Sequence, residues 1–461
     1  MTQIGEEIRK FWEENETFEK GQQLAEGHPS FVFYDGPPSA NGKPGIHHVM
    51  ARTIKDVFCR YKAQKGYFVD RKAGWDTHGL PVELGVEKKL GITKEDIGKK
   101  ISVDDYNHAC RTEVLQYKDL WDELTKQMGY WVDLKHPYIT FENEYIETLW
   151  FLLKMLYDKG LLYKGYTIQP FSPAAGTGLS SHELNLPGCY RDVKDTTCVA
   201  MFRILSKLSD YSEFSELSEM PTYAIAWTTT PWTLPSNTAL CVGPAIDYVL
   251  VETTHPYNGE ACRIIMAKAL FGNFFTEGEP DEKSKLLHGR IIKECKGTAL
   301  EGIAYEQLIP WVKPTVVNAA KQTHRTAEKN EAFRIILGDY VTTEDGTGIV
   351  HIAPTFGADD ARVAKKGGIA DLLMYDTDGK QAPMVDRTGK FWKVEDLDPA
   401  WAKENVNLEL YNQYAGKFVK NAYDPAKTEK DMSLDVELVV MLKEQGKLFR
   451  SEKHTHSYPH C

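Results

Sequence analysis

The sequence lacks several features that mark specialised classes of protein. None of its eight cysteines forms a C-x-x-C pair, and no internal repeat or low-complexity tract is present. No apolar run approaches the ~18 residues of a membrane span. The segment from Thr2 to Phe18 is charged and amphipathic, unlike a signal peptide. These absences predict a cytoplasmic protein with reduced thiols and no membrane contact.

A strong positive charge is also missing. The net charge is −11 over 461 residues, which argues weakly against a general electrostatic grip on nucleic acid and leaves room for a local basic patch. The composition is 42% hydrophobic and 26% charged, which is typical of a globular protein. A chain of this length can bury two or three cores.

The stretch from residue 31 to 66 organises the first part of the chain. An apolar run at 31–34 predicts a buried strand, and the Gly- and Pro-rich cluster at 35–45 predicts a turn. A helix is predicted from His47 and His48 onward, because the following apolar residues repeat with a helical period. These residues are Met50, Ile54, Val57, Phe58 and Tyr61. Imidazoles at a helix start favour bound phosphate, although paired histidines there are also common surface caps.

The order of elements predicts an α/β fold. Strand, turn, helix and a second strand at 67–69 indicate a right-handed parallel crossover of the Rossmann type. Residues 2–25 are expected to form an N-terminal helix and a polar connector, and further helices are predicted at 103–128, 144–159 and 434–445. After residue 165 short β-rich runs replace the helices, at 223–227, 248–251, 263–266, 333–337 and 348–352. They indicate an inserted, mainly β, barrel-like domain. We expect three parts: residues 1–195, the insert 196–420 and a return segment 421–461.

Four strings of residues resemble one known family. The string FYDGPPSANGKP at 33–44, followed by the histidine pair, resembles the front of a class I aminoacyl-tRNA synthetase. The string GWDTHGLPVE at 74–83 resembles the isoleucyl branch in particular. The strings AWTTTPWTLPSN at 226–237 and GTGIVHIAPTFGADD at 346–360 resemble the editing domain of that branch. The resemblance implies a Rossmann-like catalytic half-domain with an inserted editing domain, and a ligase that uses ATP with Mg²⁺, isoleucine and tRNA-Ile.

The resemblance also implies roles for residues of the first site. It places ATP against Asn41, Gly45, His47 and His48, with the two histidines catalytic. It places the isoleucine ammonium on Asp76, the isoleucine side chain against Pro37 and Trp75, and His78 beside them. Asp76 alone reads equally as a turn-stabilising aspartate, and His78 as a packed loop histidine. The full enzyme is expected to be a monomer, and this fragment is expected to have no metal site and no tightly bound cofactor.

The first site departs from the family pattern His-x-Gly-His. The four positions here are Gly45, Ile46, His47 and His48, so a histidine stands where the family has glycine. Either His47 reaches the phosphate from a shifted position, or activation of the amino acid is impaired. The second family signature, Lys-Met-Ser-Lys-Ser, is absent. We therefore expect an N-terminal fragment that cannot aminoacylate alone.

The second site is expected in the β insert. The resemblance implies that Asp360 holds the ammonium of mis-activated valine, and that the hydroxyls of Thr228, Thr229 and Thr230 position the ester and water. Further members are Trp232, Thr233 and His351, the last of which limits the side-chain size. Alone, a threonine run is ordinary strand material, and acids after a glycine loop are ordinary helix caps. Two alternatives stay open: a free-standing aminoacyl-tRNA deacylase, and a non-catalytic tRNA-binding relative.

Overall fold

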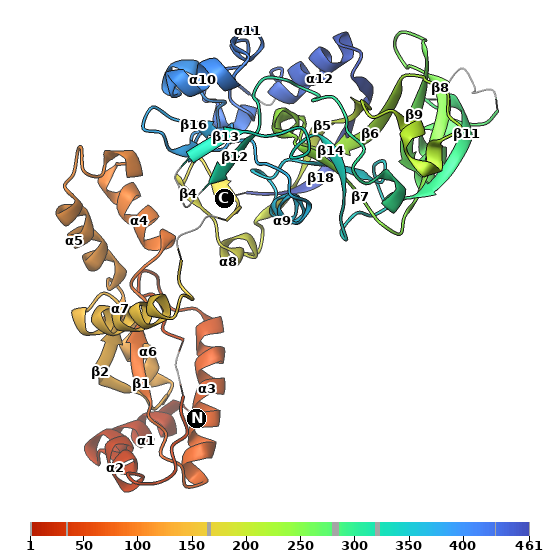
Figure 1. The fold of residues 1–461 in the computed structure, drawn as a ribbon. Helices are drawn as coiled ribbons and strands as arrows, with labels where there is room; N and C mark the ends of the chain where they lie inside the picture. Colours follow the sequence, from red (N-terminus) through yellow and green to blue (C-terminus); the bar gives the residue numbers. More distant parts are fainter. Residues whose placement is uncertain are drawn as a thin grey trace. The chain divides into compact units, whose positions relative to one another are not determined.

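The computed structural model describes residues 2–33, 36–163, 167–278, 285–318, 323–428 and 430–460 (Figure 1). The chain divides into two compact units, Met1–Gly165 and Tyr166–Cys461. Each unit has its own core and is described by itself. Among the described helices, none combines the length and apolar character that crossing a membrane requires.

The first unit is mainly helical. Its helices are α1 (Thr2–Glu14), α2 (Thr17–Leu24), α3 (Ile46–Gln64), α4 (Leu80–Leu90), α5 (Val103–Val114), α6 (Lys118–Gln127) and α7 (Asn143–Asp158). Two strands, β1 (Lys72–Trp75) and β2 (Asp133–Ile139), pair in parallel. The predicted helices that begin near His47 and Glu144 are confirmed as α3 and α7.

Four predictions for this unit are wrong. The predicted second strand at 67–69 is not a strand, because only Phe68 forms an isolated bridge there. The polar connector expected after the N-terminal helix is largely the helix α2. The described part of the predicted strand, Phe31–Phe33, is not a strand, although Ser30 before it forms a parallel bridge with Phe68. Tyr34 and Asp35 lie outside the described residues. The single helix predicted over 103–128 is two helices, α5 and α6. The chain breaks before α6 because the N–H of Tyr117 donates to the carbonyl of Ala40 at 3.0 Å instead of continuing the helix.

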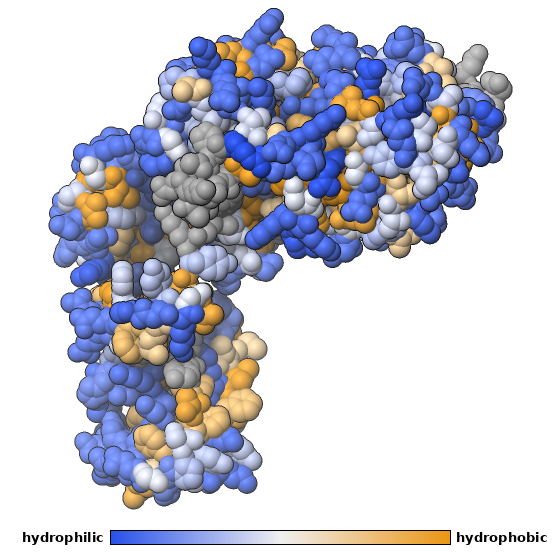
Figure 2. All heavy atoms as spheres, in the orientation of Figure 1, coloured by the Kyte–Doolittle hydropathy of each residue, from blue (hydrophilic) through white to orange (hydrophobic). Residues whose placement is uncertain are grey.

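The predicted apolar face of α3 is present but is not buried. Its members are between half and two-thirds exposed: Met50 62%, Ile54 57%, Val57 60%, Phe58 59% and Tyr61 54%. Figure 2 shows apolar side chains gathered over this helix. The helical period therefore predicted the helix correctly. An apolar face with this period is usually buried, but the face of α3 is exposed in the part of the chain that the structure describes.

The second unit is built on two sheets. The larger has the strand order β10-β11-β8-β9-β6-β5-β18, and the smaller has the order β14-β7-β15. The strands of the larger sheet are β5 (Tyr190–Arg203), β6 (Thr222–Thr228), β8 (Asp247–Thr254), β9 (Ala261–Ala267), β10 (Phe275–Thr276), β11 (Leu287–Lys296) and β18 (Leu448–Pro459). Those of the smaller sheet are β7 (Ala239–Val242), β14 (Arg334–Leu337) and β15 (Ile349–Ile352). All five β-rich runs predicted from the sequence are strands of these sheets.

The second unit also contains shorter strand pairs and helices. Three two-stranded pairs are β3 (Phe171–Ser172) with β4 (Thr177–Gly178), β12 (Thr315–Asn318) with β13 (Thr323–Thr326), and β16 (Met374–Tyr375) with β17 (Gln381–Ala382). The helices are α8 (Ser181–Leu184), α9 (Ala358–Gly367), α10 (Pro399–Asn405), α11 (Leu408–Tyr411) and α12 (Leu434–Glu444). The helix predicted at 434–445 is α12, which ends before Gly446 in the left-handed region, φ 66°.

One hydrophobic core joins the two sheets and α12. It includes buried residues of β5, β6, β15 and α12, among them Phe202, Ile225, Ile349 and Leu438. The loop before β15 fastens the sheets together: the hydroxyl of Thr347 donates to the carbonyl of Ile225 at 2.7 Å. The predicted α/β fold with a barrel-like β domain is thereby confirmed. The exact domain boundaries at 195 and 420 stay predictions.

The last strand lies beside the first of the larger sheet. β18 runs antiparallel to β5 from Leu448 paired with Ala200 to Pro459 paired with Tyr190. Residues 448–459 of the expected return segment are therefore part of the second unit's sheet. They bring His454 and His456 next to β5 and β6.

Candidate functional site

The histidine pair begins α3. The N–H of Gly45 donates to Nδ1 of His48 at 2.9 Å, and the rings of His47 and His48 have centroids 3.8 Å apart. Because Nδ1 of His48 accepts this hydrogen bond, the neutral ring carries its proton on Nε2. Burial, followed by the nearby His47 and Arg52, lowers the pKa of His48. Near neutral pH this ring is an uncharged donor through Nε2.

Two tryptophans support this helix start. The ring of Trp121 lies edge-on to His48, with centroids 4.7 Å apart, and its Nε1 donates to the carbonyl of Gly42 at 2.8 Å. Trp75 packs edge-on to Trp121 at 6.4 Å and is only 2% exposed. The Nε1 of Trp75 is buried and has no partner among the described residues. The tryptophans therefore join the glycine-rich turn to β1 and α6.

The loop after β1 lies against the same turn. The N–H of Asp76 donates to the carbonyl of Pro38 at 3.1 Å, and Oδ1 of Asp76 accepts from the N–H of His78 at 3.2 Å. Nδ1 of His78 lies 3.0 Å from the hydroxyl of Thr140. Pro37 and Asn41 are half-buried on the turn itself. The predicted members of the first site thus belong to two adjoining segments, and their roles stay predictions.

The threonines of the second site follow the end of β6. The N–H of Thr230 donates to Oγ1 of Thr228 at 3.1 Å, and the two hydroxyls lie 3.4 Å apart. Thr229 is half-buried between them. The short 3₁₀ helix η4 (Pro231–Ser236) begins directly afterwards. Thr228 and Thr230 therefore present two hydroxyl groups side by side.

His351 closes one side of this segment. The hydroxyl of Thr233 donates to the carbonyl of Thr230 at 2.9 Å and lies 3.3 Å from Nε2 of His351. Since that hydroxyl proton is used, the histidine donates from Nε2. Its Nδ1 is buried without a partner in the described part of the chain. Burial lowers the pKa of His351 to about 4, so the ring is neutral at physiological pH.

Asp360 belongs to the first turn of α9. Its Oδ2 accepts from the N–H of Ala353 at 2.9 Å, and its Oδ1 accepts from the hydroxyl of Tyr340 at 3.2 Å. Burial raises the pKa of Asp360 against these two hydrogen bonds. A carboxylate offers about four acceptor positions, so the two used here leave room for an ammonium group. Whether the carboxylate faces the threonines with a ligand bound stays a prediction.

An aromatic pair connects the segment of the threonines with the loop before Asp360. The rings of Trp232 and Phe356 meet edge-on with centroids 5.0 Å apart. Phe356 lies within the loop that connects His351 to Asp360, and Trp232 lies between Thr230 and Thr233. The structure therefore brings the two editing strings together, through this pair and through Thr233 with His351.

Two contact residues were not predicted from the sequence. Tyr340 binds Asp360, and Asp435 of α12 accepts from the N–H of Trp232 at 2.9 Å. Neither residue belongs to a recognisable string, and Asp435 is 203 residues from Trp232. The helical pattern at 434–445 placed Asp435 on a helix but gave no sign of its partner.

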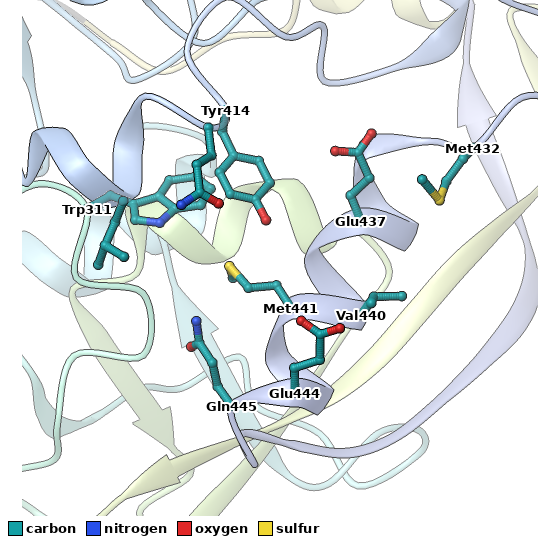
Figure 3. Close-up of a pocket in the computed structure, with 10 residues that line it drawn as sticks. Trp311, Tyr414, Met432, Glu437, Val440, Met441, Glu444 and Gln445 are labelled. Carbon is teal, nitrogen blue, oxygen red and sulfur yellow. The ribbon is translucent and has the colours of Figure 1, made fainter.

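A cavity elsewhere in the second unit contains none of the predicted site residues. It measures about 350 Å³ and lies beside α12 (Figure 3). Its walls include Trp311, Tyr414, Glu437 and Met441. It is therefore separate from the threonine segment.

Comparisons with known proteins show the family of this chain. The family model of class I tRNA synthetases (I, L, M and V) matches residues 7–445. Isoleucine–tRNA ligases are 59% identical in Porphyromonas gingivalis and 58% in Bacteroides fragilis, each covering 100% of this chain but only 40% and 39% of the relative. The ligase of Cytophaga hutchinsonii is 52% identical over 100% of this chain and 40% of the relative. The chain thus spans about 40% of the length of the curated relatives it matches.

Similarity to solved structures is weaker. The editing domain of a P. knowlesi cytosolic leucyl-tRNA synthetase is 13% identical, with a TM-score of 0.27, over 39% of this chain and 71% of that chain. This similarity is too low to assign residues. The match of the family model covers most of the sequence and both sites. The chain therefore belongs to the class I tRNA synthetase family.

Proposed function

We propose that the protein acts as an isoleucine–tRNA ligase, and that its second unit hydrolyses tRNA carrying valine in place of isoleucine. The proposal is supported by the 59% identity to a curated isoleucine–tRNA ligase over the whole of this chain. The isoleucyl strings at 74–83 and 226–237 support it independently, because both lie in the sites described above. ATP, isoleucine and tRNA-Ile are the substrates, and the full-length protein works as a cytoplasmic monomer.

The first site is assigned to activation of isoleucine. ATP lies against Asn41, Gly45 and the start of α3, where helix-end N–H groups, the Nε2 proton of His48 and the imidazole of His47 stabilise phosphate charge. The isoleucine carboxylate attacks the α-phosphorus of ATP and displaces pyrophosphate. A helix start with a neutral Nε2 donor fits this task, since it attracts anions without a fixed charge. Mg²⁺ bound together with ATP would neutralise part of the phosphate charge.

The amino-acid side of this site is assigned to the loop after β1. The carboxylate of Asp76 pairs with the ammonium of isoleucine, and Pro37 and Trp75 line the pocket for its side chain. His78 orients Asp76 through its backbone N–H. The buried, unpartnered Nε1 of Trp75 supports the assignment, because a buried donor without a partner is uncommon except where a ligand or water completes it.

The second site is assigned to editing. One methylene in an apolar pocket is worth only about 1–3 kcal/mol, so an activation site cannot reject valine strongly; isoleucine against valine is the standard illustration of this limit. A second pocket that hydrolyses valyl-tRNA removes the errors. Asp360 holds the valine ammonium, the hydroxyls of Thr228, Thr229 and Thr230 position the ester and water, and the rim of Trp232, Thr233 and His351 limits the size of the side chain.

Substitution of Asp360 tests the editing assignment. Asp360→Ala is expected to lower hydrolysis of valyl-tRNA-Ile by about 100-fold or more, because the ammonium loses its charge-assisted partner. Asp359→Ala is the matched control, since Asp359 precedes it on α9 but is solvent-exposed and pairs with Arg362 at 3.2 Å. Release of labelled valine from the tRNA is the measurement. Full activity of Asp360→Ala would remove the assignment.

A further inference from the structure

The start of η4 is capped in an unusual way. Thr230 is its N-cap residue but makes no side-chain cap hydrogen bond, although threonine commonly caps the N–H groups two or three residues later. The carboxylate of Asp435 does this instead, because its Oδ1 accepts from the N–H of Trp232 at 2.9 Å. Asp435 belongs to the first turn of α12, a remote element. The hydroxyl of Thr230 is consequently not used by the helix.

That hydroxyl lies beside a second one. Oγ1 of Thr230 is 3.4 Å from Oγ1 of Thr228, at the end of β6 where the editing reaction is proposed to occur. If Thr230 capped η4, its hydroxyl would turn toward the N–H of Trp232 or Thr233 and away from Thr228. The remote cap therefore determines which way this hydroxyl points.

Asp435 is held in place by a buried network of charges. It is 2% exposed, and its Oδ2 lies 3.1 Å from Nζ of Lys420. The same ammonium lies 3.0 Å from Oδ2 of Asp195 on β5, which is 3.2 Å from Nε2 of His456 on β18. An unpaired carboxylate at such a depth is costly, whereas a paired one is fixed in geometry. Lys420 thus favours the charged form of Asp435 and fixes its carboxylate beside the N–H of Trp232.

We propose that Asp435 is a positioning residue for editing, which caps η4 from α12 and so leaves the Thr230 hydroxyl for the substrate ester. Lys420 supports it by compensating its charge. This inference rests on the proposed editing function. It adds a residue that contacts neither the ester nor the water and that acts through Thr230.

Hydrolysis of valyl-tRNA-Ile by the 461-residue chain provides the test. Asp435→Ala is expected to lower kcat about 30-fold with little change in KM, because a small displacement of a positioning hydroxyl slows the reaction more than it weakens binding. Asp435→Asn retains an acceptor oxygen and should keep kcat within about 5-fold of the wild type. Glu437→Gln is the control on the same helix; Glu437 pairs with Lys417 at 2.6 Å and should leave hydrolysis unchanged.

A double-mutant cycle with Thr230→Val separates positioning from a general structural effect. If Asp435 acts through the Thr230 hydroxyl, then Asp435→Ala should cost almost nothing further once that hydroxyl is removed. The proposal would be overturned if Asp435→Ala lowered kcat by the same factor in the wild type and in Thr230→Val. It would also be overturned if Asp435→Ala had the kcat of the wild type. Should Asp435→Ala fail to fold, the pair Asp435→Ala with Lys420→Met removes the buried carboxylate together with its counter-charge, leaves Asp195 with His456 as its partner, and still takes the cap from Trp232. It should show the same dependence on Thr230.

The proposed function and this inference fail in different ways. Absence of hydrolysis by the wild-type chain would remove the editing function and the inference with it. Hydrolysis by the wild type together with an active Asp435→Ala would remove only the inference. A crystal structure of Asp435→Ala adds a readout that does not depend on activity: Oγ1 of Thr230 should lie within hydrogen-bond distance of the N–H of Trp232 or Thr233. An unchanged Thr230 rotamer would contradict the mechanism.

Discussion

Thr233 and His351 are 118 residues apart in the sequence, yet Oγ1 of the threonine lies 3.3 Å from Nε2 of the histidine. This contact joins η4 to β15 and brings together the two strings that resemble an editing domain. The histidine is 8% exposed, and burial lowers its pKa to about 4. A neutral imidazole with a buried, unpartnered Nδ1 suits a wall that limits size, because it carries no charge to attract the substrate's phosphates.

The low pKa of His351 predicts a loss of stability in acid. The unfolded chain binds this proton near pH 6.5 and the folded chain only near pH 4, so the unfolded state gains protons first as the pH falls. The contribution of His351 to the free energy of unfolding is fully present above about pH 6.5. It decreases by about 3 kcal/mol in total as the pH falls toward 4. His351→Gln removes this dependence. Urea unfolding of both proteins at several pH values measures it, and identical pH slopes would contradict the prediction.

Lys420 is predicted to be essential for the stability of the second unit. It pairs with Asp195 at 3.0 Å and with the buried Asp435 at 3.1 Å. Lys420→Met leaves a buried carboxylate without its counter-charge, which costs about 3–5 kcal/mol at pH 7. Glu437→Gln removes the partly exposed ion pair between Glu437 of α12 and Lys417, and should cost less than about 1 kcal/mol. Urea unfolding midpoints of the two variants provide the comparison.

The pH dependence of Lys420→Met distinguishes charge from packing. Burial already raises the pKa of Asp435 in the presence of Lys420, and loss of the lysine raises it further. A carboxyl with a raised pKa binds its proton more readily in the folded state, so the defect should be largest at neutral pH and shrink as the pH falls. A defect that is constant from pH 7 to pH 5 would indicate lost packing instead.

Local signals in the sequence predicted much of this molecule. Short β-rich runs predicted five strands of the second unit, β6, β8, β9, β14 and β15, but not β5 or β11, and the helical period predicted α3, α7 and α12. The helix break before α6 was missed, because it depends on a hydrogen bond from Tyr117 to the distant Ala40. β18 was missed as well, since its residues include several charged and imidazole side chains that pair with β5 only in the folded chain.

The same division holds for the candidate sites. The strings of the family predicted a shared site for Thr228, Thr230, His351 and Asp360, and the structure joins the two strings through Thr233 with His351; the place of Asp360 in that site stays a prediction. Asp435 carries no such string, and its contact with Trp232 spans 203 residues. Residues that act by supporting others are therefore the ones that pattern reasoning overlooks.

His48 is predicted to be a neutral Nε2–H tautomer at pH 7. The N–H of Gly45 donates to its Nδ1 at 2.9 Å, and burial is the main cause of its lowered pKa. The ring of His48 therefore becomes protonated and charged only at a pH below the ordinary histidine pKa of about 6.5. Long-range ¹H–¹⁵N NMR spectra recorded from pH 5 to pH 8 report both the tautomer and the titration. An Nδ1–H tautomer would show that the Gly45 contact does not persist in solution.

The apolar face of α3 is predicted to cause self-association of this chain. Ile54 and Phe58 are 57% and 59% exposed and belong to a contiguous stripe that includes Met50 and Tyr61. Exposed apolar surface of this kind promotes association. Replacing both residues with lysine should lower the sedimentation coefficient at high protein concentration. Because both side chains are exposed, the free energy of unfolding measured in urea should change by less than about 0.5 kcal/mol per substitution.

A conservative pair of changes completes that test. Ile54→Val with Phe58→Leu keeps the stripe apolar and should leave the concentration dependence of sedimentation as it is in the wild type. If the lysine variant, the conservative variant and the wild type all associate equally strongly, the apolar face of α3 is not the surface through which the chains associate. If association is lost in the lysine variant alone, the apolar stripe of α3 is the surface through which the chains associate. The lysine and the conservative substitutions change the same two positions and differ in polarity.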